Sequence, residues 1–357
     1  MNTCHRRQSH WKHLFVFFGM VPLILQVHEM VRTKSDESRQ VSHSMRDCDY
    51  LAVVDTHVNT PAIPLYGDFC DLKVLGEKQP WNTKKKIISF SLFRNKNTTV
   101  DSNFQNKYVM GLHVNAKLLK LYYPGWILRL HTSGLGDSDI ERIIDPHDLH
   151  TDVIEVVKCD KEPFLLEKSA RMMIHRTLAI DDPKVDVVIV RDLDGRFMTR
   201  EIMATNEWLG SPLQLHSMRD HEQHDIAVMG GMFGMKKGYF EESNKTVTSL
   251  VQKFVEDHKG NDYLCDFGDG QCFLRDYLWP LVQNVTMSHD IDLKRCEKFG
   301  SKECLPFPTG GNNPRSDYFV GQPNAGTGFV KEDEVLSFAE FPISVITNNK
   351  NLIDQNP

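Results

Sequence analysis

Residues 185–195 read VDVVIVRDLDG, and this stretch decides the fold. A short apolar run rich in β-branched side chains predicts a buried strand over residues 185–190. The strand leads through one arginine into Asp192-Leu193-Asp194, in which two carboxylates flank one apolar side chain. Carboxylates at this spacing can share one hard divalent cation while Leu193 points into the core. The stretch therefore predicts a core strand with a metal site at its carboxyl end.

The rest of the chain alternates between short apolar runs and helical periodicity. The other expected strands cover residues 87–93, 126–130, 153–157, 225–229 and 284–287. The expected helices cover residues 104–119, 164–178, 200–209, 247–256 and 272–279. This alternation predicts a Rossmann-like α/β fold, with a mostly parallel sheet, helices on both faces and a loop-rich C-terminal part. Ligands of such sheets bind beyond the carboxyl ends of the strands, where Asp192 and Asp194 are expected.

The start of the chain has the pattern of a targeting segment. Arg6, Arg7 and Lys12 precede an uncharged apolar run, Leu14–Val27. Such a run rises about 21 Å as a helix, less than the roughly 30 Å hydrocarbon core, but no small-residue cleavage site follows it. We therefore expect a signal anchor with residues 1–13 in the cytosol and the rest in the lumen. The alternative is a cleaved signal peptide and a secreted protein.

Composition separates three further parts beyond the apolar run. Residues 28–49 are polar and charged, which is typical of a stem. Residues 50–330 carry the alternating strands and helices and are the expected folded domain, which leaves residues 331–357 as a C-terminal tail. The formal charge of -6 and the pI near 6.2 provide no basic surface for a phosphate backbone, so nucleic acid is not an expected partner.

Sequons and cysteines agree with a lumenal location. The sequons stand at Asn97, Asn244 and Asn284. Together with the anchor they predict a single-pass type II protein of the Golgi or endoplasmic reticulum membrane. Seven of the eight cysteines follow the apolar run, where the compartment oxidises thiols. Two local pairs are close enough in sequence to bond, although connectivity stays open: Cys265 with Cys272, and Cys296 with Cys304.

Further blocks surround the acidic stretch in a fixed order. Downstream stand RE at 200–201, NEWL at 206–209, HSMRDH at 216–221, GGMFG at 230–234, PFP at 306–308 and FVGQ at 319–322, and YPGW stands upstream at 123–126. Together they resemble a largely uncharacterised group of Asp-x-Asp glycosyltransferase-like proteins, over roughly residues 85–322. The resemblance implies a GT-A-like fold and transfer of a sugar from a nucleotide-sugar donor with Mn²⁺ or Mg²⁺.

The chain departs from the group at two places. Gly195 stands where the group usually has serine, and Gly270-Gln271 stands where it usually has Asp-Gln. If that aspartate assists catalysis, Asp269 or Asp266 has to replace it, and otherwise the chain is weakened or inactive.

Other side chains are candidates for the same site. His289 follows an expected strand and is a candidate third metal ligand, with an ordinary surface histidine as the alternative. Arg191 and Arg196 flank the acidic pair and are expected either to contact a diphosphate or to balance the charge of the pair. Inverting sugar transfer needs a carboxylate base, for which Asp220 is the first candidate and Glu207 the second, with a structural ion pair as the alternative for each.

These features predict a metal-dependent glycosyltransferase of the secretory pathway that acts on a glycan or glycoprotein acceptor. Asp192, Asp194 and His289 are the expected metal ligands. One alternative is an inactive GT-A-like protein that binds a glycan or another partner. The other is a metal-dependent phosphohydrolase or nucleotidyltransferase, which the acidic strand end alone also permits. The sequence leaves open the sugar, the acceptor and whether the transfer inverts or retains configuration.

Overall fold

The computed structural model describes residues 63–66, 70–76, 84–94, 105–144, 153–161, 173–258, 268–309 and 319–323. They all belong to one compact unit, Pro61–Pro357. The expected tail, anchor and stem at residues 1–49 and the C-terminal tail at 331–357 lie outside the described residues, so these boundaries stay predictions. No helix in the part of the chain that is described is long and apolar enough to cross a membrane.

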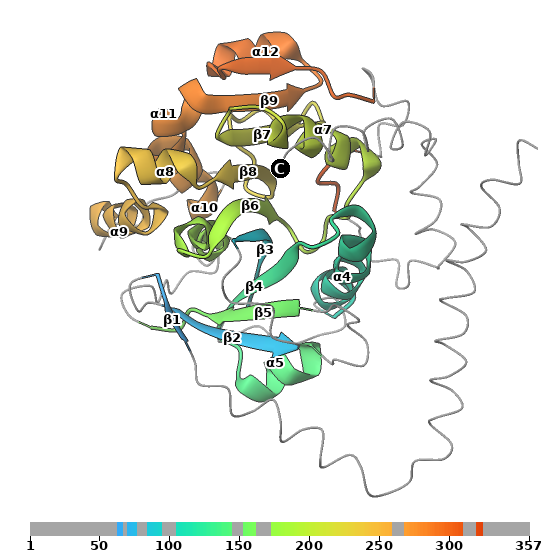
Figure 1. The fold of residues 1–357 in the computed structure, drawn as a ribbon, viewed down its shortest axis with the longest axis vertical. Helices are drawn as coiled ribbons and strands as arrows, with labels where there is room; N and C mark the ends of the chain where they lie inside the picture. The colour runs from blue at the N-terminus through green and yellow to red at the C-terminus, as the bar shows by residue number, and fades with distance from the viewer. Residues whose placement is uncertain are drawn as a thin grey trace, which may run out of the picture. The chain divides into compact units, whose positions relative to one another are not determined.

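A ten-stranded sheet forms the centre of the described part (Figure 1), in the order β1-β2-β5-β4-β3-β6-β8-β7-β9-β10. Its strands are β1 (Ile63–Leu65), β2 (Cys70–Gly76), β3 (Lys85–Phe93), β4 (Ile127–Ser133), β5 (Val153–Lys158), β6 (Val185–Arg191), β7 (Leu215–Arg219), β8 (Met232–Lys236), β9 (Thr286–Asp290) and β10 (Glu303–Leu305). The run β5-β4-β3-β6 is parallel, as expected. Because β8 is antiparallel to both of its neighbours, and β2 to β1 and β5, the sheet is mixed.

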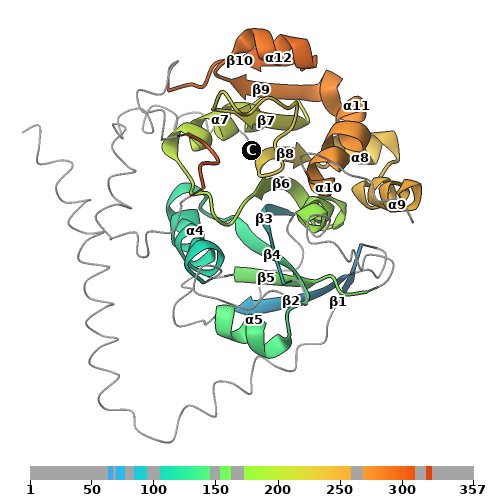
Figure 2. The same cartoon turned by 180° about the vertical axis from the view of Figure 1, so that it is seen from behind.

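Helices cover both faces of this sheet, as predicted. They are η1 (Gln105–Val109, a π-helix), α4 (Met110–Tyr122), α5 (Asp137–Ile143), η2 (Met173–Asp181, a 3₁₀ helix), α7 (Thr199–Leu209), α8 (Gly238–Ser243), α9 (Val247–Asp257), α10 (Asp269–Phe273), η3 (Leu274–Leu278, a π-helix), α11 (Trp279–Val282), η4 (Gln283–Val285, a 3₁₀ helix) and α12 (Leu293–Phe299). Figure 2 shows α4 and α7 on the opposite side of the strands from α8 to α11.

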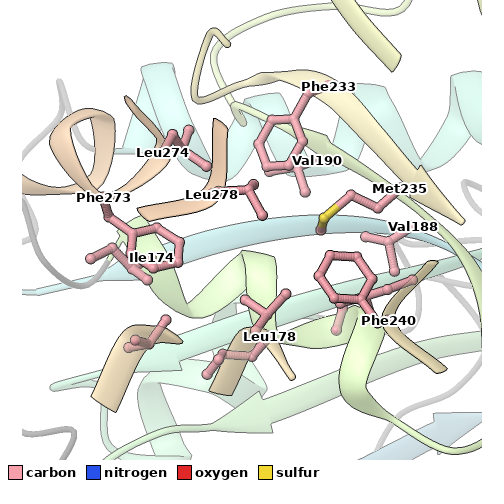
Figure 3. Packing of buried hydrophobic residues seen from close by; sticks show 14 of the residues in the cluster. Ile174, Leu178, Val188, Val190, Phe233, Met235, Phe240, Phe273, Leu274 and Leu278 are labelled. Atoms are coloured by element: carbon pink, nitrogen blue, oxygen red, sulfur yellow. The ribbon is translucent and has the colours of Figure 1, made fainter. Parts of the chain in front are cut away.

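The two faces of β6 explain why residues 187–190 in it are all apolar. Val188 and Val190 belong to one core cluster, which includes side chains of η2, β8 and α10 (Figure 3). Val187 and Ile189 belong to the other cluster, with side chains of α4 and with Trp208 of α7. A strand that is buried on both faces has no polar alternation, which is the pattern that identified it in the sequence.

Some predicted elements were wrong. Residues 225–229 form no strand, and the strands of this region are β7 and β8 on either side of them. β7 contains polar side chains, including His216 and Arg219, that are 1 % exposed or less. They are buried because they pair with polar side chains of β9, so hydrophobicity alone does not reveal the strand. The C-terminal part is also more regular than expected, since it contains α12 and β10.

Disulfides confirm one predicted cysteine pair and add another. Cys296 and Cys304 are bonded and tie α12 to β10. Cys70 of β2 is bonded to Cys159, 89 residues away and just after β5. Cys272 is also disulfide-bonded, whereas Cys265 lies outside the described residues. The long-range bond joins strands whose pairing the sequence did not predict.

The directions of the strands bring several loop segments to the same side of the sheet. β3, β4, β5 and β6 are parallel to one another, β8 reverses direction, and β7, β9 and β10 run in the same direction as β6. The residues that follow these strands therefore lie on one side of the sheet, at the carboxyl ends of the strands. We call this side the carboxyl edge. Residues 230–231, which lead into the antiparallel β8, reach the same edge. Asp192 and Asp194 lie there, as the fold class predicted.

Candidate functional site

The acidic pair lies in a tight loop directly after β6. The loop is closed by a hydrogen bond of 3.3 Å from the Gly195 amide to the Asp192 carbonyl oxygen. Leu193 is 3 % exposed and packs into the core, as expected from its place between the two carboxylates. The side chain of Asp192 is 37 % exposed and that of Asp194 is 15 % exposed. The two carboxylates are therefore held at the carboxyl edge by a buried side chain between them.

Two glycines allow other segments to approach this loop closely. A Cβ on Gly231 would lie 1.9 Å from Asp192 Oδ2. A Cβ on Gly111 of α4 would lie 2.0 Å from the Leu193 carbonyl oxygen. Both distances are far inside van der Waals contact, so neither position accepts a side chain while the loop keeps this conformation. Gly231 is one of the two glycines of the GGMFG block, and the group that it approaches is the carboxylate of Asp192.

Each carboxylate has a basic partner that the sequence did not reveal. Arg176 of η2 is 3 % exposed and donates to Asp192 Oδ1 and, at 2.9 Å, to the Arg191 carbonyl oxygen. Lys107 of η1 has its Nζ 3.1 Å from Asp194 Oδ2. Arg176 lies 16 residues before Asp192, in the helix that precedes β6, and Lys107 lies much further back in the sequence. A single basic residue in a helical pattern carries no signal of what it will contact.

Arg191 and Arg196 point under the loop, away from solvent. Arg191 is 1 % exposed, lies 3.1 Å from Glu201 Oε1 and donates to the Gly231 carbonyl oxygen at 3.0 Å. Burial raises the pKa of Glu201 to about 7, against the opposing effect of Arg191. Arg196 donates to the Leu193 carbonyl oxygen at 2.9 Å, and its burial lowers its pKa to about 10 although Asp194 opposes this shift. Both guanidinium groups thus brace the loop, and their proposed contact with a diphosphate stays a prediction.

Asp220 follows β7 and therefore lies at the same edge as Asp192. Two strand spacings separate it from the β6 end, roughly 10 Å. Its carboxylate accepts hydrogen bonds from Arg200 Nε at 2.9 and 3.0 Å and from the Val320 amide at 3.0 Å. Burial raises the pKa of Asp220, and Arg200 and the Val320 amide oppose this. The residue is thus part of the edge and also anchors residues 319–322 to it.

Glu207 and His289 lie together, apart from the acidic pair. His289 is fully buried, and its Nε2 lies 3.1 Å from Glu207 Oε2. Its Nδ1 lies 2.8 Å from His216 Nε2, and burial lowers the pKa of both histidines. β9 is three strands from β6 in the sheet, roughly 14 Å. The structure therefore brings the proposed ligand His289 to Glu207 and not to Asp192.

The donor set for a metal consists of the two loop carboxylates. Among the residues described, no group of three or more histidine, cysteine, aspartate or glutamate side chains is placed to hold a metal ion. Mg²⁺ and similar hard cations are commonly bound by one or two carboxylates together with substrate phosphates and water. Asp192 and Asp194 supply the two hard oxygen ligands of such a site. These two ligands suit an ion whose remaining ligands come from substrate phosphates and water. They are too few for a site in which the protein supplies every ligand.

The departure at Gly270-Gln271 lies next to this loop. Gln271 Oε1 accepts a hydrogen bond of 3.0 Å from the Gly230 amide, and its Nε2 donates to the Val228 carbonyl oxygen. Gln271 thus fixes the segment that packs against Asp192. Gly270 itself carries no side chain toward the loop. Asp266 lies outside the described residues, as does the side chain of Asp269, so their substitution for the missing aspartate stays a prediction.

Comparisons with known proteins give low levels of similarity. No family model matches the chain, and no curated protein matches it. The structure is similar to the galactosyltransferase LgtC in complex with donor and acceptor sugar analogues, with 15% identity, 57% of this chain and 73% of that chain covered, and a TM-score of 0.36. It is similar to the glycosyltransferase GlyE of Streptococcus pneumoniae TIGR4, with 13% identity, 75% and 63% covered, and a TM-score of 0.38. A cytidylyltransferase from Leptospira borgpetersenii matches with 14% identity, 77% and 99% covered, and a TM-score of 0.34.

Proposed function

We propose that this protein is a metal-dependent glycosyltransferase that moves a sugar from a nucleotide-sugar donor to a glycan or protein acceptor in the secretory pathway. The observation that carries the proposal is the loop after β6. There, Asp192 and Asp194 stand at the carboxyl edge, and Gly231 leaves space for the Asp192 carboxylate. The ordered sequence blocks that resemble Asp-x-Asp glycosyltransferases support it, because most of them meet at this edge.

The residues around the pair hold it in one geometry. A divalent ion on Asp192 and Asp194 would neutralise the charge that develops on a departing nucleoside diphosphate. Arg176 fixes one oxygen of Asp192 from below, and Leu193 anchors the loop between the two carboxylates. Asn115 of α4 donates to the Gly195 carbonyl oxygen at 2.9 Å and closes the loop from the other side. Ligands held this rigidly lose little freedom on binding, which favours transition-state stabilisation.

We propose Asp220 as the base for an inverting transfer, with its buried carboxylate held by the ion pair with Arg200. It shares the carboxyl edge with Asp192, on the side of β7 and β9. The Glu207 carboxylate contacts His289 of β9, which lies one strand further from β6 than β7, the strand that Asp220 follows. We therefore propose that Asp220 accepts the proton of the acceptor hydroxyl. Arg200 stabilises its ionised form.

A donor hydrolysis screen tests the proposal. The purified lumenal part would be incubated with uridine, guanosine and cytidine nucleotide sugars, with Mn²⁺ and with excess chelator. We expect release of nucleotide from one donor, dependent on Mn²⁺. Glycan binding without hydrolysis of any donor would favour the inactive alternative. Cleavage of phosphate esters or formation of nucleotide sugars from a nucleoside triphosphate would favour the other enzyme classes.

A further inference from the structure

Lys107 is the more exposed of the two basic residues that contact the acidic pair. Its Nζ lies 3.1 Å from Asp194 Oδ2, with the lysine side chain 31 % exposed. Arg176, by contrast, is 3 % exposed and is held by both the Arg191 carbonyl oxygen and Asp192. Arg176 is therefore a fixed part of the loop support. Lys107 reaches the loop from the side that faces solvent.

The position of Lys107 relative to the acidic loop is set by tight packing. It precedes α4, and α4 is docked on the loop at Gly111, where no Cβ fits against the Leu193 carbonyl oxygen. Asn115, one turn further along α4, donates to the Gly195 carbonyl oxygen. Lys107 lies about one turn before Gly111 on the same helical segment. Its contact with Asp194 is thus imposed by the fold and is not a chance meeting of two surface side chains.

A divalent ion and the ammonium group of Lys107 compete for the same carboxylate. An ion that binds Asp194 brings two positive charges to within a few ångströms of Nζ, so the two repel each other. The lysine stem is flexible and partly exposed, so Nζ can move away, which the buried guanidinium of Arg176 cannot do. The nearest new partner for Nζ would be the anion that accompanies the ion, because a diphosphate held by an ion on Asp194 would lie close to that carboxylate.

On the basis of the proposed function, we propose that Lys107 exchanges partners: it neutralises Asp194 in the ligand-free protein and binds the diphosphate of the donor in the loaded protein. The two roles have opposite consequences for two ligands. Loss of the ammonium group removes a competitor of the metal and should strengthen binding of Mn²⁺ alone. The same loss removes a phosphate contact and should weaken binding of a nucleoside diphosphate. A residue with only a structural role would move both affinities in one direction.

Lys107→Met tests this crossed effect, with Lys117→Met as the matched control because Lys117 is an exposed lysine of the same helix. Mn²⁺ binding without nucleotide would be followed by the electron paramagnetic resonance signal of free Mn²⁺. Binding of UDP and GDP at saturating Mn²⁺ would be followed by calorimetry. For Lys107→Met we expect Mn²⁺ to bind about threefold to fivefold more tightly and the preferred diphosphate about tenfold more weakly. Lys117→Met should match the wild type in both.

Lys107→Arg keeps the charge and serves as a second variant. It should leave Mn²⁺ affinity near that of the wild type and retain most of the diphosphate affinity. If Lys107→Met shifts both affinities in the same direction, or neither, while the wild type binds both ligands, the exchange is overturned and the proposed function stands. If the wild type binds no nucleoside diphosphate with Mn²⁺ present, the proposed function falls and this inference with it.

Discussion

The carboxylate of Asp192 occupies the space beside the Cα of Gly231, where a Cβ would stand 1.9 Å from Oδ2. Gly231→Ala should therefore push Asp192 or the start of β8 out of place. We expect a loss of stability of about 1–3 kcal/mol, typical of overpacking, and a larger loss of Mn²⁺-dependent donor turnover. Thermal melting and donor hydrolysis measure the two effects. Gly210→Ala is the control, since the nearest atoms to a Cβ there are at an ordinary 3.6 Å.

Asp194→Asn removes a negative charge and keeps the size of the side chain. We expect donor turnover to fall by about two orders of magnitude or more, because several kcal/mol of transition-state stabilisation depend on the metal. Stability should change by at most about 1 kcal/mol, since the lost ion pair with Lys107 is partly exposed. Turnover and melting temperature are compared with the wild type. Full activity in the variant, or in the wild type with excess chelator, would remove the metal from the mechanism.

Asp220→Asn and Glu207→Gln separate the two candidate bases. Both variants keep a hydrogen-bond acceptor for their present donors, Val320 and His289. We expect Asp220→Asn to lower kcat by about 10²–10⁴, the usual contribution of a general base, with little change in donor KM. Glu207→Gln should change kcat less than threefold. A larger loss of kcat in Glu207→Gln than in Asp220→Asn would make Glu207 the base. Small and equal losses would leave both residues with structural roles.

Glu201 should make stability depend on pH. Its folded-state pKa is raised to about 7 by burial, so the folded protein binds a proton that the unfolded chain has released at that pH. The stabilisation is fully present below about pH 4.5 and is lost as pH rises through about 7. Urea unfolding between pH 5 and 8 should show a decline in the wild type. In Glu201→Gln the free energy of unfolding should fall by a few kcal/mol less over this pH range. Equal pH dependence in the two proteins would contradict the prediction.

Asn244 should carry a glycan in cells. It is exposed at the end of α8, in the left-handed conformation with φ 50°, and Thr246 of its sequon is exposed as well. Treatment with an endoglycosidase should lower the apparent mass of the wild-type protein. The untreated Asn244→Gln variant should be lighter than the untreated wild type by the mass of one glycan. The same extracts test the expected signal anchor, because an anchored protein resists alkaline carbonate. Release by carbonate would favour the secreted alternative.

The sequence by itself determined β6 and the placement of the acidic pair. The strand predicted over 185–190 is Val185–Arg191 in the structure, since a β-branched run that is buried on both faces is a local signal. Leu193 points inward, as its place between two carboxylates predicted, and α7 covers Thr199–Leu209 where a helix over 200–209 was predicted. The bond between Cys296 and Cys304 could be proposed because the two cysteines are only 8 positions apart in the sequence.

Only the tertiary structure decided which partner each charged side chain has. Arg191 flanks the pair in sequence yet turns inward to Glu201. Arg176 and Lys107, from two other helical segments, contact the pair. β7 was missed because its polar side chains are buried against those of β9. The periodicity of hydrophobic residues in the sequence indicates which side of a helix or strand is buried. The contact between two polar groups depends instead on how separate segments pack, and that information is spread over the whole chain.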